Sequence, residues 1–271
     1  MSSPMPPHRV RSDWPFYIGL GILGGSYVLL IVAMLAAKFV FIRPNHMIEA
    51  LSIPRIQYSI QLSLVSCSLT TVLALWVAVP LGYSLSRYRF FGKQVVETLV
   101  DVPIVLPPLV VGLALLILFS MRPLRDLDRV FPVTFAIPSV VLAQFAVATA
   151  FAVRTMRVTF DQINPRTEAV ALTLGCSRGQ AFWQVALPQA RRGILAAGTL
   201  AWARSLGEFG PILIFSGTTK FRTEVLPTSI WLQFQESHLE LALAVSIMLV
   251  IAAAIVLIIA RVFGLRGAAP L

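Results

Sequence analysis

Charged residues are scarce in this chain. Asp, Glu, Lys and Arg together make up 13% of its 271 residues, whereas soluble domains carry about a quarter. Hydrophobic residues supply 57% of the sequence. This composition excludes an ordinary soluble enzyme and indicates a protein that is embedded in a membrane.

Cysteine and histidine are also rare, which limits the chemistry that the chain can perform. The two cysteines, Cys67 and Cys176, fall in an apolar segment and in a polar loop, so we expect neither a disulfide nor a metal site. The three histidines, His8, His46 and His238, fall in a tail and in loops. No apolar segment therefore holds the histidine and carboxylate groups of an intramembrane hydrolase, and we expect no catalytic residue and no cofactor in this chain.

Motifs for nucleotide binding and for internal duplication are absent. The sequence has no G-x-x-x-x-G-K-[ST], because Gly92-Lys93 lacks the upstream glycine and the following hydroxyl residue. The chain therefore does not bind ATP through a P-loop. We also find no repeat with a period of about 20–50 residues and no inverted repeat of the kind that secondary transporters carry.

Long apolar segments dominate the sequence. About 20 apolar residues cross the roughly 30 Å hydrocarbon core of a bilayer, and six segments meet that requirement: 16–37, 58–85, 100–120, 133–153, 194–215 and 241–263. We therefore predict an all-α membrane protein with six transmembrane helices. The first apolar run is longer than the core of a signal peptide, about 7–15 residues, so we expect it to be retained.

The polar segments at the two ends and the basic residues predict the topology. Residues 1–15 read as a disordered tail, 16–57 as the first helix with an outer loop, and 264–271 as a short tail without an appended regulatory domain. With the N-terminus in the cytoplasm, thirteen Lys and Arg residues fall inside and eight fall outside, which predicts that both termini are cytoplasmic. The net charge of +10 then reflects orientation and contact with anionic lipid, and we expect no nucleic-acid partner.

The loop between the fourth and fifth segments is polar and unusually long, a length that is uncommon without a function. Good helix formers run over 168–174, and Gly175 then predicts a helix end. Ser177 with Gln180 has the spacing of a capping box for a second helix, and Pro188 marks its end or a kink. The pattern predicts a short helical elbow on one aqueous face, suited to contact with a soluble partner.

Two apolar segments carry residues that disturb a membrane helix. Pro103, Pro107 and Pro108 near the start of the third segment remove backbone donors, and the resulting kink could serve packing or a transport path. The fifth segment holds an ion pair, Arg204 and Glu208, four residues apart on one helical face. Such pairs either hold helices together or lie along a path or gate, and both interpretations stay open.

The elbow resembles the cytoplasmic "EAA" loop of ABC-transporter permeases, through Glu168-Ala169, Gly175 and Val185-Ala-Leu187-Pro188. Val170 stands where the family has a second alanine. Further matches narrow the resemblance to the molybdate permease and its sulfate and tungstate relatives: residues 102–112, 203–210, 217–219 and 224–227. Pro211 replaces an alanine of that pattern. The resemblance covers about residues 58–263, with the coupling loop at about 154–192.

The resemblance implies a type I importer in the bacterial cytoplasmic membrane. Two copies of the permease would bind two copies of an ATP-binding cassette subunit, which carries ATP and magnesium, and an extracytoplasmic substrate-binding protein would deliver the cargo. The cargo would be a tetrahedral oxyanion, molybdate first, with tungstate or sulfate and thiosulfate as alternatives. Other possibilities are an ABC permease for a polyamine, ferric ion or thiamine, and a secondary transporter that works alone.

The resemblance also implies roles for individual residues. In the family, the elbow seats in a groove of the ATPase, which assigns coupling roles to Glu168, Ala169, Gly175, Arg178, Leu187 and Pro188. We expect Glu168 and Arg178 to make polar contacts with that partner. The residues expected to line or gate the path are Pro107, Pro108, Arg204, Ser205, Gly207, Glu208 and Gly210.

Overall fold

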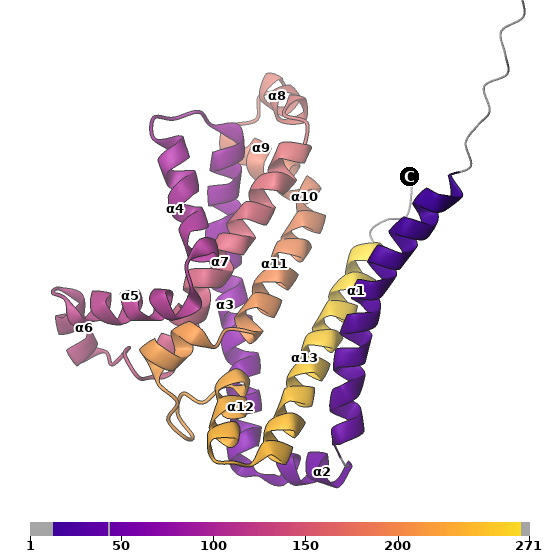
Figure 1. Cartoon of the computed structure of the whole chain (residues 1–271). Coiled ribbons are helices and arrows are strands. Elements are labelled where there is room, and N and C mark those ends of the chain that lie inside the picture. The colour runs from indigo at the N-terminus through magenta and orange to yellow at the C-terminus, as the bar shows by residue number, and fades with distance from the viewer. Residues whose placement is uncertain (1–12, 43, 267–271) are drawn as a thin grey trace, which may run out of the picture. The chain divides into compact units, whose positions relative to one another are not determined.

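The computed structural model describes residues 13–42 and 44–266. All regular structure in these residues is helical, which confirms the all-α prediction (Figure 1). Most of the two predicted tails, residues 1–12 and 267–271, lies outside the described part of the chain. The chain forms two compact units, Met1–Pro44 and Asn45–Leu271.

The first unit contains the single helix α1 (Trp14–Phe41). Its apolar residues point in every direction around the axis, as expected of a helix that is surrounded by lipid. Large side chains such as Leu23 and Val40 are mostly exposed. The helix extends the predicted segment 16–37 by a few residues at both ends.

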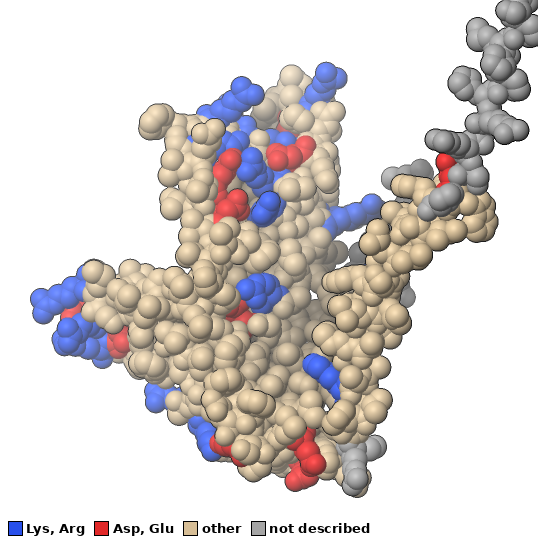
Figure 2. All heavy atoms as spheres, in the orientation of Figure 1, with Lys and Arg blue, Asp and Glu red and all other residues tan. Residues whose placement is uncertain are grey.

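The second unit contains the remaining helices. In chain order they are α2 (Pro44–Ser52), α3 (Pro54–Arg87), α4 (Lys93–Val105), α5 (Pro108–Ser120), α6 (Leu124–Val130), α7 (Ile137–Gln162), α8 (Arg166–Thr173), α9 (Arg178–Ala181), the π-helical turn η1 (Phe182–Ala186), α10 (Leu187–Gln189), α11 (Arg191–Leu206), a second π-helical turn η2 (Ile212–Ser216), α12 (Leu226–Gln235) and α13 (Leu239–Arg266). Figure 2 shows that charged side chains on the visible face gather mainly at the extremities of this unit, with mostly uncharged surface between them.

The count of six transmembrane helices is not confirmed. Within the described residues, four helices are long and apolar enough to cross a bilayer: α1, α3, α7 and α13. The third predicted segment, 100–120, is broken into α4 and α5, which meet at 114° and could together supply a fifth crossing. The fifth, 194–215, is interrupted between α11 and η2.

Proline chemistry explains the first of these two breaks. Proline disfavours the helical conformation of the residue before it, and Leu106 and Pro107, which both precede a proline, have ψ angles of 139° and 133°. The sequence predicted a kink in the third segment, and the structure shows a full break there, because the two adjacent prolines extend the backbone at Leu106 and Pro107.

Small side chains let α3, α7 and α11 pack closely (Figure 1). Their shared core contains six alanines without exposed surface, two from each helix: Ala74, Ala78, Ala148, Ala152, Ala197 and Ala201. Small residues allow backbones to approach where lipid provides little hydrophobic driving force. These three helices form the scaffold on which the elbow and the broken segments are placed.

Candidate functional site

The elbow begins with a glycine-terminated helix, as the sequence predicted. Gly175 follows α8 with φ +91°, a left-handed conformation that glycine adopts without penalty. Its N–H donates to the Leu172 carbonyl at 3.1 Å, and the Cys176 N–H donates to the Ala171 carbonyl at 3.1 Å. These two bonds form a Schellman motif, so the chain reverses here with its backbone groups satisfied.

The second half of the elbow starts with the predicted capping box. The Ser177 hydroxyl accepts from the Gln180 N–H at 3.3 Å, and the Gln180 side chain accepts from the Ser177 N–H at 2.8 Å. Helical backbone continues through α9, η1 and α10. A π-helical turn directly precedes Pro188, whose missing N–H cannot support the regular ladder.

Glu168 points into the chain and is only 8% exposed. The Tyr83 hydroxyl donates to Glu168 Oε2 at 2.5 Å, and Arg87 Nε donates to Glu168 Oε1 at 2.8 Å. Arg87 Nη2 also donates to the Ile163 carbonyl at 2.9 Å. The expectation that Glu168 offers its carboxylate to a partner protein therefore does not match this geometry, because both oxygens are already bonded to α3.

Sequence reasoning missed Tyr83 and Arg87. Tyr83 and Arg87 stand four residues apart near the end of a predicted helix, which could have drawn attention to them. No residue near them in the sequence indicates that Glu168 is their partner. Together with Ala169 and Arg178 the three residues line a pocket of about 200 Å³ between α3 and the elbow.

The other residues expected to couple to an ATPase lie elsewhere on the elbow. Arg178 is exposed, Gly175 forms the turn, and Leu187 and Pro188 lie beyond η1. The surface near the turn includes two exposed apolar side chains, Val170 and Leu174, at 57% and 80% exposure.

The two broken segments meet each other. A Cβ atom added to Gly210 would lie 2.8 Å from Pro108 Cβ, and one added to Gly112 would lie 2.7 Å from Pro211 Cα. Only glycine permits such approach, so the breaks at Pro107-Pro108 and at 207–211 form one backbone-to-backbone junction. The structure thus brings together two motifs that the sequence placed about 100 residues apart.

Arg204 and Glu208 form the predicted ion pair at the end of α11. Arg204 Nη1 lies 2.9 Å from Glu208 Oε2, and the guanidinium also lies 5.7 Å from the centre of the Phe151 ring. Glu208 is 1% exposed, yet neither of its oxygens accepts a well-aligned hydrogen bond from a described residue. The two charged groups are therefore in contact, but the Glu208 carboxylate does not fill its hydrogen-bonding capacity.

A third unpredicted residue, Gln144 of α7, supports the break after α11. Its Nε2 donates to the Ser205 carbonyl at 3.3 Å, and its Oε1 accepts from the Thr70 hydroxyl at 3.1 Å. The Ser205 carbonyl also accepts from the Glu208 N–H at 3.2 Å. A buried glutamine in an apolar helix was the available signal, because such a side chain needs partners.

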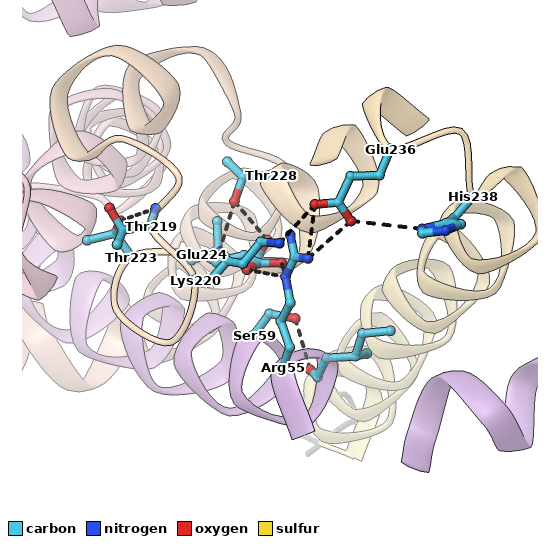
Figure 3. A network of polar contacts seen from close by, with 11 residues as sticks. Arg55, Ser59, Thr219, Lys220, Thr223, Glu224, Thr228, Glu236 and His238 are labelled. Carbon is cyan, nitrogen blue, oxygen red and sulfur yellow. Dashed lines mark hydrogen bonds and ion pairs between the residues drawn. The ribbon is translucent and has the colours of Figure 1, made fainter. Parts of the chain in front are cut away.

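The opposite end of α3 carries a polar network that sequence reasoning also missed (Figure 3). Arg55 Nε donates to both oxygens of Glu224, at 2.9 and 2.7 Å, and Arg55 Nη1 donates to Glu236 at 3.3 Å. Glu236 also pairs with Lys220 at 3.0 Å. Hydrogen bonding from Lys220, together with the charge of Arg55, holds the pKa of Glu236 below its ordinary value.

These features define a membrane transport component, with several membrane-crossing helices, a junction of broken apolar segments and an exposed elbow. The chain belongs to the family of binding-protein-dependent transport system inner membrane components, which matches residues 71–266. It is a multi-pass inner-membrane protein and the non-catalytic subunit of an ABC importer, whose ATPase is a separate subunit.

Several curated proteins are similar to this chain. The probable molybdenum ABC transporter permease protein of Haloferax volcanii is 40% identical over 188 residues, 69% of this chain and 68% of that protein. The molybdate/tungstate transport system permease protein WtpB of Thermococcus kodakarensis is 35% identical over 76% of this chain and 79% of its own length. The sulfate transport system permease protein CysT of Escherichia coli is 28% identical over 92% and 91%.

Solved structures support the fold. A bacterial ABC transporter that imports the acidic polysaccharide alginate has a chain with a TM-score of 0.75 and 18% identity, covering 95% of this chain and 97% of that one. The same kind of transporter in complex with an alginate-bound periplasmic protein gives a TM-score of 0.74 and 19% identity, covering 94% and 95%.

Proposed function

We propose that this chain is the permease subunit of an importer for a tetrahedral oxyanion, with molybdate as the leading cargo. The observation that carries the cargo assignment is the relative of 40% identity, which is named for molybdenum. Tungstate and sulfate are the alternatives, since WtpB and CysT are named for them.

The proposed assembly contains two copies of this chain, two ATP-binding subunits and an extracytoplasmic binding protein. Its permease core spans 58–263, the coupling loop spans about 154–192, and both termini are cytoplasmic. The exposed apolar side chains at the turn of the elbow, Val170 and Leu174, support docking on a soluble subunit, because apolar surface in water is usually covered by a partner. ATP and magnesium bind to that subunit.

The proposed path runs by the junction of the two breaks. Arg204 attracts a dianion, and Glu208 neutralises Arg204 while no anion is present. The weak hydrogen bonding of Glu208 supports a pair that can separate. Pro107, Pro108, Ser205, Gly207 and Gly210 hold the backbone that positions it. The structural alternative is a pair that only joins the end of α11 to its surroundings.

The first test is uptake by the chain reconstituted with its ATP-binding subunit and its extracytoplasmic binding protein. Labelled molybdate should enter only with hydrolysable ATP, and unlabelled molybdate should compete better than tungstate or sulfate. A stronger effect of sulfate would reassign the cargo. Transport by the chain alone in vesicles would reject the importer proposal.

The second test addresses the turn of the elbow. Gly175→Val should abolish uptake while the protein still inserts, because a β-branched residue opposes a φ of +91°. Gly175→Asn is the matched control and should retain most of the uptake, since asparagine tolerates the left-handed region. Equal activity of the two variants would show that the turn geometry is unimportant for coupling.

A further inference from the structure

We propose that α3 transmits movement between the elbow and the outer segment 217–226, because ion pairs fasten it at both ends. The inner clamp is defined as Tyr83, Arg87 and Glu168, and the outer clamp as Arg55, Glu224 and Glu236. Movement of the elbow by an ATPase is part of the proposed function, but the fastening of α3 is a property of this chain alone. At 34 residues, α3 is about 50 Å long.

The inner clamp joins the last turns of α3 to the elbow. Tyr83 and Arg87 bind the two oxygens of Glu168 separately, at 2.5 and 2.8 Å. The Tyr83 ring also meets Phe160 of α7 and Phe182 of η1, with centroids 5.3 and 4.7 Å apart. A rigid displacement of α8 must therefore move the end of α3 or break these contacts.

The outer clamp joins the first turns of α3 to the turn-containing loop that leads into α12, the segment 217–226 (Figure 3). Three consecutive bonds attach alternate residues of that segment to α3. The Tyr58 hydroxyl donates to the Arg222 carbonyl at 3.1 Å, the Arg55 guanidinium donates to Glu224, and the Leu226 N–H donates to Ser63 at 2.8 Å. Glu224 has no exposed surface, so the Arg55 guanidinium takes the place of water as the hydrogen-bond donor to its carboxylate.

The outer clamp also reaches the next helix. Arg55 Nη1 donates to Glu236 at 3.3 Å, directly after α12, and Glu236 bonds Lys220 at 3.0 Å. Figure 3 shows Arg55 between the two glutamates. A shift of α3 along its axis therefore displaces both the segment 217–226 and the end of α12.

The ion pairs are better explained as contacts that align α3 with its neighbours than as a source of folding stability. A buried ion pair costs desolvation energy, and apolar residues of the same volume are often as stable. Charged forks with two or more hydrogen bonds do fix relative position strongly. Their placement at the two ends of one unbroken helix gives both surfaces a common element, which transmission by movement of that helix requires. Coupling of this kind is reciprocal, so each end should sense the other.

Hydrogen–deuterium exchange of the chain in lipid nanodiscs tests the inference. The variants are Glu168→Gln at the inner clamp, Glu224→Gln at the outer clamp, and their combination. Glu168→Gln should raise exchange at least about threefold in 217–226, and Glu224→Gln should do the same in 166–176. Effects of independent distant sites multiply to within about twofold, and the combined variant should fall short of that product.

Controls separate transmission from a loss of folding. Asp126→Asn removes an exposed acid of α6 and should change neither segment, and exchange in α5 should stay constant in all variants. Tyr83→Phe removes only one hydrogen bond of the inner clamp and should raise exchange in 217–226 less than Glu168→Gln does. It replaces Glu168→Gln as the test variant if that variant unfolds.

Two results would overturn the inference. One is a change confined to the mutated end in every variant, and the other is a combined effect equal to the product of the single effects. If the proposed function is wrong, the unmodified protein shows no ATP-dependent uptake. The exchange measurements do not depend on that result.

Discussion

The junction between the two broken segments gives a sharp prediction for Gly112→Ala. The added methyl group would lie 2.7 Å from Pro211 Cα, 3.0 Å from Pro211 O and 3.2 Å from Ile214 Cβ. Two of these atoms belong to the backbone and cannot rotate away. Overpacking of this kind costs about 1–3 kcal/mol. Alanine offsets up to about 1 kcal/mol of that cost, because it favours a helix more than glycine does.

We therefore expect Gly112→Ala to lower the stability of the protein by up to about 3 kcal/mol, and by less where the helix preference of alanine offsets part of the overpacking. Because the added methyl group forces α5 and η2 apart, the rate of ATP-dependent uptake should fall as well. Thermal unfolding in nanodiscs measures the first effect, and reconstituted uptake measures the second.

Gly24→Ala is the matched control for this prediction. Gly24 is also helical, but an added Cβ would meet nothing within 4 Å, so the variant should unfold at or above the temperature of the unmodified protein. If the Gly112 and Gly24 variants were indistinguishable in stability and uptake, the close contact at the junction would be refuted.

Three further predictions concern other parts of the molecule. Gln144→Leu should lower the unfolding temperature, because it removes a hydrogen bond to the Ser205 carbonyl and a lost buried partner costs about 1–3 kcal/mol. Gln144→Glu keeps the size of the side chain and should not restore the unfolding temperature of the unmodified protein. Ser177→Ala should cost about 1 kcal/mol by removing a helix cap and should raise amide exchange in α9 only. The lowered pKa of Glu236 implies stabilisation that is complete above the ordinary glutamate pKa of about 4.3. That stabilisation is lost as the pH falls through the lower folded value. Exchange in 217–226, corrected for intrinsic rates, should therefore rise below about pH 4, and Lys220→Met should move that rise to higher pH.

The sequence could predict what depends on neighbouring residues. The turn at Gly175 and the capping box of Ser177 and Gln180 are set by residues within three or four positions of each other, and both are confirmed. The spacing of Arg204 and Glu208 likewise predicted their contact. These features need no knowledge of the rest of the fold.

The sequence could not predict contacts between distant parts of the chain. Tyr83 and Arg87 are 85 and 81 residues from Glu168, so the inward orientation of that carboxylate depends on how α8 packs against α3. The 114° angle at Pro107-Pro108 has a similar origin. Two adjacent prolines predict an interruption of the helix, but the direction of α5 depends on its contact with residues 210 and 211.

The buried carboxylates differ in a way that bears on their roles. Glu168 and Glu224 each accept at least two hydrogen bonds from α3, across more than 80 residues of sequence. Glu208 faces only Arg204, four residues away, and accepts no well-aligned bond from the described residues. A buried charge that serves only to join helices should be fully bonded, because an unsatisfied one costs stability without fixing a position. The contrast favours structural roles for Glu168 and Glu224 and favours the interpretation of Arg204 and Glu208 as a separable pair on the transport path.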